Sequence, residues 1–510
     1  MLLSRRVNVS SLLFRFDWLK LALIAGLVLV GAGFSTITLQ NFFLNLPFAY
    51  GEGPIVRDGL VLSRGELFYK HLGEAPPFTL SNYTPVYYLL LSFVFQLTGV
   101  SFIPGRLISL FAGLGVIFFV YGIVFRCTKN RSAAILAALM LFASPFQFNL
   151  SLNRVDATAA LLSMWAVSVV LGASFTMRQA VIAGILAGLA ALTRQTAFIL
   201  PLILCLGFHG SRLRYRECAS FLAALFSLVG GVSLVLERVT ASAFSFNIVS
   251  GNLNSLELDR LILASANIGE VYFFPLLILL FIRFNRLDVG AHRPLLGWLI
   301  IAATPTTLAI AKSGSNLNYL TEMYACLAIV FGIVVASLES QKIRRGAILL
   351  SLLWCSLPSF GLALKMPQSL NSLASAEMQR SALVQFIRKC QGPILTDDLM
   401  GLELLAEKQI IFQPYEVNQL ARKGLWNDRK LRRLLRTKRF SAALIAQPFS
   451  RRFIRMERWS KAQWRILRRG YQSRGSFGQN EIYLPKAALH SQVATLSPIL
   501  ETSCSVAVYL

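Results

Sequence analysis

Acidic side chains and metal-binding side chains are scarce in this sequence. Its 510 residues include 24 aspartates and glutamates against 50 lysines and arginines, with four histidines and seven cysteines. The cysteines are scattered, with neither a Cys-x-x-Cys pair nor a Cys/His spacing, which excludes the common zinc-binding modules. Cys390 and Cys504 share the carboxyl-terminal segment, so a disulfide between them would require that segment to face an oxidising compartment.

The chain contains more apolar sequence than a soluble protein of this length needs. Hydrophobic residues make up 55% of it, and the mean hydropathy is +0.59. Several runs are long enough to cross a hydrocarbon core of about 30 Å, which predicts an α-helical polytopic membrane protein. We predict eleven spans, at about 19–39, 106–125, 132–148, 157–175, 179–193, 196–209, 219–237, 268–283, 294–311, 321–338 and 346–364. The first run lacks a cleavage signature, so we interpret it as a retained helix.

Basic residues alternate between the predicted loops as the positive-inside rule requires. With the amino terminus inside, the inside segments carry most of the basic residues: Arg5, Arg6, Arg15, Lys20, Arg126, Lys129, Arg131, Arg178, Arg212, Arg214, Arg216, Arg283, Arg286, Arg293, Lys342, Arg344 and Arg345. The same parity puts the loop 40–105, Asp156, Lys312 and every residue after Lys365 outside.

The apolar segment Pro85–Leu97 would reverse this alternation if it crossed the membrane. We therefore predict a helix that lies in the membrane interface, with Tyr83, Tyr87 and Tyr88 at headgroup depth.

Residues 366–510 are predicted to form a separate small α/β domain outside the membrane, after a transmembrane domain at 1–365. Their short apolar runs, such as 393–395 and 442–446, alternate with basic amphipathic stretches, notably 429–439. Roughly half of the lysines and arginines lie in this segment, and the whole chain has a net charge of +26. Such a surplus is typical of nucleic-acid binding or of contact with anionic lipid headgroups, and the second fits a chain already in the membrane.

Two carboxylates beside predicted spans are candidates for acid/base chemistry. Glu52 lies between two glycines in the first outer loop, where the backbone can turn tightly and a substrate can approach. Asp156 lies at the outer end of a span, and carboxylates at a bilayer face are costly and usually functional. The alternatives are a solvated loop acid for Glu52 and a helix N-cap for Asp156.

Four cations at outer span ends, Arg106, Arg154, Arg194 and Lys312, run against the charge rule. They are candidates to bind a lipid phosphate, and the alternative is snorkelling towards ordinary phospholipid headgroups. The hairpin Lys312–Glu322 is dense in amide, hydroxyl and carboxylate groups. Such groups recognise sugars, although a plain polar turn has the same composition.

These pieces occur in an order that resembles the bacterial GT-C glycosyltransferases of the dolichyl-phosphate-mannose protein mannosyltransferase superfamily. That group includes the lipid A aminoarabinose transferases and the lipopolysaccharide-core transferases of rhizobia. The resemblance covers about residues 15–340 and is carried by five stretches: Tyr50–Pro54, Asn82–Tyr88, Gly105–Ser109, Asn153–Asp156 and Lys312–Glu322.

The resemblance implies a GT-C fold and transfer of a sugar, with inversion, from a polyprenyl-phosphate donor to a lipid or glycan acceptor. It implies catalytic roles for Glu52, which would deprotonate or orient the acceptor, and for Asp156. Arg106, Arg154, Arg194 and Lys312 would bind the donor phosphate. The substrate-binding candidates are Tyr83, Asn318, Tyr319 and Glu322. No cofactor is implied with certainty, and a divalent metal is left open.

The chain departs from the family's pattern in the first loop, where Tyr83, Thr84 and Val86 stand in place of the family's His and Lys positions. A protein acceptor is therefore not expected. Nucleic acid is not expected as a partner either.

We expect a multi-pass protein of a bacterial plasma membrane, with a cytoplasmic amino terminus. The competing hypotheses are a transporter or flippase of lipid-linked glycans, and an assembly protein whose basic tail binds an acidic polymer. Clear inverted repeats and midplane polar residues, which are typical of transporters, are not evident.

Overall fold

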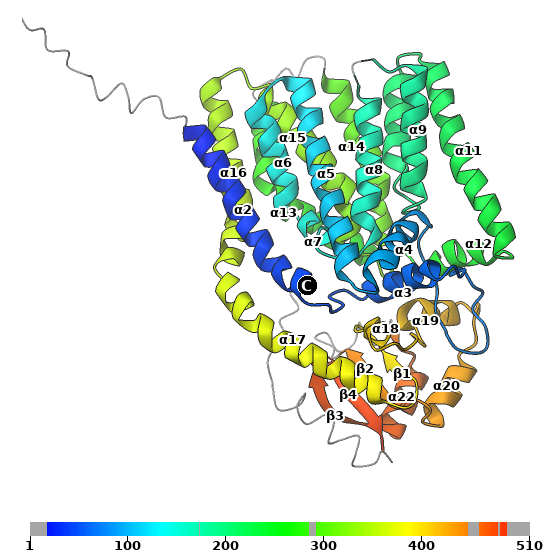
Figure 1. The fold of residues 1–510 in the computed structure, drawn as a ribbon. Helices are drawn as coiled ribbons and strands as arrows, with labels where there is room; N and C mark the ends of the chain where they lie inside the picture. The colour runs from blue at the N-terminus through cyan, green and yellow to red at the C-terminus, as the bar shows by residue number, and fades with distance from the viewer. Residues whose placement is uncertain (1–17, 173, 285–291, 447–457, 478–479, 487–510) are drawn as a thin grey trace, which may run out of the picture.

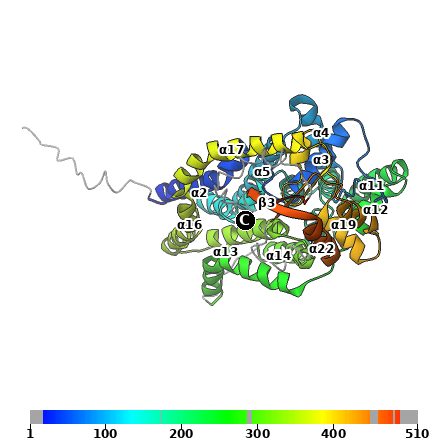
Figure 2. The same cartoon turned by 90° about the horizontal axis from the view of Figure 1, so that it is seen from below.

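The computed structural model describes residues 18–172, 174–284, 292–446, 458–477 and 480–486. It shows a bundle of helices with a smaller body of helices and strands attached to one end (Figure 1). Viewed from that end, helix α17 (Met366–Lys389) runs along one edge of the molecule, and strand β3 (Tyr471–Phe477) crosses its middle (Figure 2). The bundle and the smaller body meet around the first long loop, which the sequence places between the first two spans.

The bundle consists of apolar helices whose extents follow the hydrophobic runs of the sequence. They are α2 (Trp18–Phe43), α5 (Ile103–Thr128), α6 (Arg131–Ala143), α7 (Phe146–Asn149), α8 (Val155–Val170), α9 (Met177–Ala191), α10 (Ile199–Leu204) with a π-helical turn (Cys205–His209), α11 (Tyr215–Val239), α13 (Leu258–Phe284), α14 (Arg293–Leu308), α15 (Thr321–Ala336) and α16 (Gln341–Ala363). Each predicted span coincides with one of these helices or with a consecutive pair.

Many of these helices expose apolar side chains, as expected of a surface in contact with lipid. Within the described residues, six helices are long and apolar enough to cross a membrane, and five further apolar helices are shorter. The chain is therefore a multi-pass membrane protein, while the number of eleven crossings stays a prediction. In the most apolar stretch of the segment that includes helix α15, 83% of the residues are buried inside the protein. This burial places α15 at the centre of the bundle.

The end of the bundle that faces the smaller body is covered by short helices. These are α3 (Glu52–Ser63), α4 (Val86–Thr98), α12 (Ala243–Ile248) and the 3₁₀ turns η2 (Ser250–Asn252), η4 (Ala309–Ala311) and η5 (Leu317–Leu320). Helix α4 corresponds to the predicted interfacial helix. The prediction for two of its tyrosines is wrong, because Tyr87 and Tyr88 are fully buried and contact protein instead of headgroups. The Tyr87 hydroxyl donates to Asn153 Oδ1 at 2.8 Å.

The carboxyl-terminal body contains a four-stranded sheet with the order β1-β2-β4-β3. Strand β1 pairs parallel with β2, and the other two pairings are antiparallel. Strands β1 and β2 fall on the apolar runs at 393–395 and 442–446. The elements that accompany β3 and α17 are β1 (Ile394–Thr396), α18 (Leu402–Leu405), α19 (Pro414–Arg422), α20 (Arg429–Arg436), β2 (Ala442–Ala446), α22 (Lys461–Gly470) and β4 (Asn480–Pro485). Cys504, the predicted partner of Cys390, lies outside the described residues.

The sheet shares its hydrophobic cores with the first loop. Phe78 of that loop forms a parallel bridge to Phe412 and stacks edge-on against Trp426, with ring centroids 5.0 Å apart. Gly53 in α3 is as close-packed as glycine permits, because a Cβ there would lie 2.0 Å from the Met400 carbonyl oxygen. The carboxyl-terminal body and the first loop are therefore one packed unit, and the side chains at this contact are held in fixed positions.

Glu403 makes the stability of this unit dependent on pH. Burial raises the pKa of Glu403 from 4.5 to about 7, although Thr396 and the Gly401 N–H donate to its carboxylate. The folded state therefore keeps a proton that the unfolded chain loses, so stability falls as pH rises from about 4.5 to about 7, by roughly 3 kcal/mol. Replacing Glu403 with Gln mimics the protonated form. We expect thermal unfolding scans between pH 5 and pH 8 to show a growing advantage for Glu403→Gln; parallel curves would contradict this assignment.

Candidate active site

A cluster of buried ions lies at the end of the bundle that faces the first loop. Asp156 is at its centre and is fully buried. One carboxylate oxygen accepts from Arg194 Nη1 at 3.1 Å and from Asn318 Nδ2 at 2.8 Å. The other accepts from Arg154 Nε at 3.1 Å. Two guanidinium groups therefore share one carboxylate, an arrangement that keeps the aspartate ionised and fixes both arginines.

Asp156 owes its position to the start of α8, which begins one residue earlier. The predicted alternative, an N-cap, is wrong: Arg154 occupies the cap position and no side chain caps this helix end. The backbone of Arg154 is extended, at φ −140° and ψ 152°. This local geometry brings the side chains of Arg154 and Asp156 into contact. Side chains at positions i and i+2 of a regular helix do not face each other.

Helix α15 and the turn before it supply the remaining members of the cluster. Glu322, in the first turn of α15, forms an ion pair with Arg194 Nη2. Its Oε2 atom is buried without a hydrogen-bond partner among the described residues. The Tyr319 ring lies against the Arg194 guanidinium at 5.8 Å. The structure thus brings together Asp156, Arg194, Asn318, Tyr319 and Glu322, while their roles towards a substrate stay predictions.

Arg154 is the member of the cluster that is best placed to meet a ligand. Its side chain is 16% exposed, against 4% for Arg194 and none for Asp156. Its Nη2 donates to the Tyr83 hydroxyl at 3.4 Å. Nη1 faces Gly51, where a Cβ would lie 3.5 Å from it. Among the described residues, no acceptor is bonded to Nη1, and the glycine at position 51 places no side chain beside this nitrogen.

Glu52 and Arg106 form a second, separate pair beside this cluster. Both side chains are fully buried, and the Arg106 guanidinium binds both carboxylate oxygens, at 2.9 and 3.0 Å. Arg106 also donates to three main-chain carbonyl groups, those of Asn41 in the last turn of α2 and of Leu44 and Leu46 just after it. These bonds use all five N–H donors of the arginine. The prediction that Arg106 binds the donor phosphate is therefore replaced by a structural role.

The Glu52 carboxylate is equally saturated. Besides Arg106 it accepts from the main-chain N–H groups of Phe48 at 2.7 Å, Asn153 at 2.7 Å and Ala49 at 3.4 Å. A general base needs a lone pair directed at its substrate, and protonation would break this charge pair in the protein interior. The geometry therefore disfavours the predicted deprotonating role. The predicted alternative, in which Glu52 orients the acceptor, stays a prediction; the bonds seen here fix the loop that carries Gly51 beside Arg154.

Lys312 lies at the edge of the site and is linked to it through two asparagines. Its Nζ donates to Asn252 Oδ1 at 3.2 Å, and Asn252 Nδ2 donates to the Asn82 carbonyl oxygen at 3.0 Å. Burial and the nearby charge of Lys423 lower the pKa of Lys312 to about 8. The lysine therefore carries its charge at neutral pH and loses it in mildly alkaline solution.

This titration predicts how the binding of a lipid phosphate depends on pH. A phosphate monoester stays doubly ionised above pH 7, so a loss of affinity between pH 7 and pH 9 would report the lysine. We expect the wild-type protein to bind polyprenyl phosphate roughly tenfold more weakly at pH 9 than at pH 7, because Lys312 has lost its charge at the higher pH. Lys312→Arg keeps its charge and should show a flat profile in the same titration by microscale thermophoresis. A wild-type profile that is equally flat would remove Lys312 from the phosphate site.

The sequence analysis missed the carboxyl-terminal residues that border the site. Glu416, in the first turn of α19, accepts from the Tyr50 hydroxyl at 2.8 Å and from Asn82 Nδ2 at 3.3 Å. Tyr50 and Asn82 directly precede Gly51 and Tyr83, two of the residues that lie against the Arg154 side chain. Burial raises the pKa of Glu416. Because the glutamate and its partners are more than 330 residues apart in sequence, only its place in the first turn of a short helix could have singled it out.

Within the described residues, no three His, Cys, Asp or Glu side chains are grouped as a metal site requires.

Comparisons with known proteins agree with this architecture. The family model of dolichyl-phosphate-mannose-protein mannosyltransferases matches residues 82–235. Curated protein sequences give no match. The structure is similar to ArnT from Cupriavidus metallidurans bound to undecaprenyl phosphate, with 13% identity, a TM-score of 0.58, and coverage of 89% of this chain and 98% of that one.

It is also similar to the Archaeoglobus fulgidus oligosaccharyltransferase AglB in complex with an inhibitory peptide and a dolichol-phosphate. Here the identity is 14% and the TM-score 0.53, with coverage of 90% of this chain and 72% of that one. Likeness at such identities establishes the fold. Together with the family model, it confirms the resemblance to the GT-C group that the sequence motifs indicated.

Proposed function

We propose that this chain, which has the GT-C fold, is a membrane glycosyltransferase that moves a sugar from a polyprenyl-phosphate-linked donor to a lipid or glycan acceptor of the cell envelope. The observation that carries the proposal is Arg154, a partly exposed guanidinium with an open Nη1 at the end of an apolar helix bundle. A polyprenyl phosphate has the complementary form, since its chain fits the apolar helices and its phosphate reaches the arginine.

In the reaction, the acceptor oxygen attacks the anomeric carbon while the bond from that carbon to the phosphate oxygen breaks. Negative charge then grows on the departing polyprenyl phosphate. Arg154 stabilises this charge directly, in a site where burial strengthens the interaction. Asp156 and Arg194 act as positioning residues, because they hold the Arg154 side chain through Asp156. Lys312 adds a second positive charge at the edge of the site.

The acceptor's proton must pass to a base, and Glu416 fits this role better than Glu52 does. The side chains that hold the Glu416 carboxylate, those of Tyr50, Asn82 and Gln413, are uncharged, and burial raises its pKa, which makes it a stronger base. Glu52 positions the first loop through its charge pair with Arg106. Tyr83, Asn318, Tyr319 and Glu322 are the groups that we assign to contacts with the donor sugar or its phosphate.

We place this end of the bundle on the outer face of a bacterial plasma membrane, with the amino terminus in the cytoplasm. The alternation of basic residues supports this orientation. Figure 1 adds that the first loop, the start of α8 and the carboxyl-terminal body lie at the same end of the bundle. The donor sugar would therefore be presented on the outer leaflet.

A reaction in detergent separates this proposal from the transporter hypothesis. Micelles have no two leaflets, so a flippase leaves a lipid-linked sugar chemically unchanged in them, whereas a transferase converts it. The experiment incubates the purified protein with a panel of sugar-labelled polyprenyl phosphates and an envelope-lipid extract, and follows the label by mass spectrometry. Labelled product in micelles supports the transferase. Unchanged donor, combined with donor translocation in proteoliposomes, would support the transporter.

A further inference from the structure

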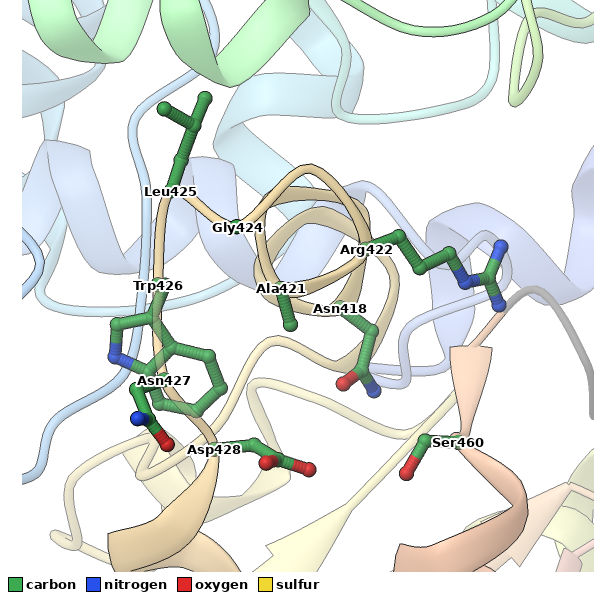
Figure 3. A pocket seen from close by; sticks show the side chains of 9 residues that line it. All are labelled: Asn418, Ala421, Arg422, Gly424, Leu425, Trp426, Asn427, Asp428 and Ser460. Atoms are coloured by element: carbon green, nitrogen blue, oxygen red, sulfur yellow. The ribbon is translucent and has the colours of Figure 1, made fainter.

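A polar cleft of about 580 Å³ lies in the carboxyl-terminal body, away from the ion cluster. It is bounded by the carboxyl-terminal end of α19, the following loop Gly424–Asp428, and Ser460 at the start of α22 (Figure 3). We propose that this cleft binds a saccharide unit of the acceptor. The proposal deepens the function proposed above and rests on it.

The cleft combines an aromatic ring with planar polar groups. In Figure 3, the Trp426 indole forms one wall, Asn427 and Asp428 follow it, and the Arg422 side chain extends from the opposite side. Sugars present apolar C–H faces and many hydroxyl groups, which are complementary to an indole and to amide, carboxylate and guanidinium groups. Asn427 and Arg422 are exposed to solvent, so their substitution has little effect on the core.

Internal bonds hold the polar walls in position. The Asp428 carboxylate accepts from Gln463 Nε2 at 3.1 Å and forms an ion pair with Arg432, whose Nε lies 2.9 Å from it. Each carboxylate oxygen has a second lone pair, so the group can still accept hydroxyl donors from the cleft. The Trp426 Nε1–H is bonded to the Gly73 carbonyl oxygen at 3.1 Å, which fixes the ring. Side chains that are fixed before binding lose little entropy when a ligand arrives.

Helix α19 connects the cleft to the ion cluster. Its first turn carries Glu416 beside Tyr50 and Asn82, and its last residue, Arg422, lines the cleft. Six residues of α-helix separate the two, which is about 9 Å along the axis. Trp426 is also bonded to the first loop at Gly73. A glycan acceptor could therefore occupy the cleft with one sugar while another unit of the same chain reaches the space in front of Arg154.

Two variants test the cleft without touching the proposed chemistry. Ala421 points into the cleft between Trp426 and Asn418 (Figure 3), so Ala421→Met fills it. Asn427→Ser removes the amide but keeps an oxygen that can accept from the Arg429 N–H, as Asn427 does at 3.0 Å. Ala382→Met is the matched control, because Ala382 is also half-buried on a helix, in α17, outside the cleft.

Binding is measured first, with the full-length protein in nanodiscs. Saturation-transfer difference NMR with D-glucose, D-mannose and D-glucuronic acid as probes should show transfer to at least one sugar. Ala421→Met should raise the Kd for that sugar roughly tenfold or more, and the Ala382→Met control should leave this Kd unchanged. Equal signals in wild type and Ala421→Met, or none for any probe, would overturn the proposal. This result does not depend on catalysis, so it stands or fails separately from the proposed function.

Kinetics then connect the cleft to the reaction. We expect Ala421→Met and Asn427→Ser to raise the acceptor KM while hydrolysis of the donor, with water as the acceptor, stays at the wild-type rate. Unchanged acceptor KM in both variants would show that the cleft does not serve the acceptor. If the wild-type protein neither transfers the sugar nor hydrolyses the donor, the proposed function is contradicted, and the binding result stays intact.

Discussion

Arg154→Gln is expected to lower kcat/KM for sugar transfer by roughly 100- to 1,000-fold, the usual effect of removing a donor that stabilises charge in a transition state. The reason is the position of Arg154, which is the more exposed of the two arginines in the cluster and has no acceptor bonded to Nη1 among the described residues. The fold should survive, because Asp156 keeps Arg194 and Asn318 as partners. Initial rates over a range of donor concentrations, with thermal unfolding as the check on folding, measure the effect.

Two further variants make the result specific. Arg154→Lys keeps the charge but loses the planar fork that binds Asp156 and a phosphate together, so partial activity is expected. Arg178→Gln is the matched control, because Arg178 is exposed in the first turn of α9, outside the cluster. Wild-type kinetics in a folded Arg154→Gln protein would exclude Arg154 from the reaction.

Glu52→Gln is expected to destabilise the protein by roughly 3–5 kcal/mol, since it leaves the Arg106 charge buried without its partner. The Gln amide would also face N–H groups that now donate to the carboxylate. Activity should fall together with the folded fraction. Thermal unfolding and hydrogen exchange of residues 44–52 measure both effects.

A double-mutant cycle separates this positioning role from the base that the sequence suggested. Arg106→Leu combined with Glu52→Gln should cost less than the sum of the single variants, by roughly 1–3 kcal/mol. If Glu52 were the base, Glu52→Gln would stay folded and bind donor, yet fail to turn over. That outcome would restore the original assignment.

The sequence predicted the bundle well because one property, hydropathy, determines both membrane insertion and helix length. Helices α5 and α15 begin within three residues of their predicted starts. The same reasoning failed for Tyr87 and Tyr88, because an apolar helix at the end of a bundle looks alike in sequence whether it faces headgroups or protein. Their burial depends on what α3 and α5 place beside them.

The sequence singled out several members of the ion cluster but not their pairing. Asp156 and Arg194 stood out as charges at a membrane face, and Glu322 as the acid that closes a polar hairpin; both are local properties. Two features depend on contacts between segments far apart in sequence. Glu52 forms its ion pair with Arg106, and Asp156 is shared between two arginines. Glu416 shows the same limit, because its partners Tyr50 and Asn82 lie in the first loop.

The central claim is tested most directly by a single-turnover reaction with purified protein in detergent and a polyprenyl-phosphate donor labelled in its sugar. We predict that free polyprenyl phosphate and a labelled acceptor form in equal amounts in wild type, and that neither forms at a comparable rate in folded Arg154→Gln. A donor that binds wild type but stays intact, or one that is cleaved equally well by Arg154→Gln, would contradict the account.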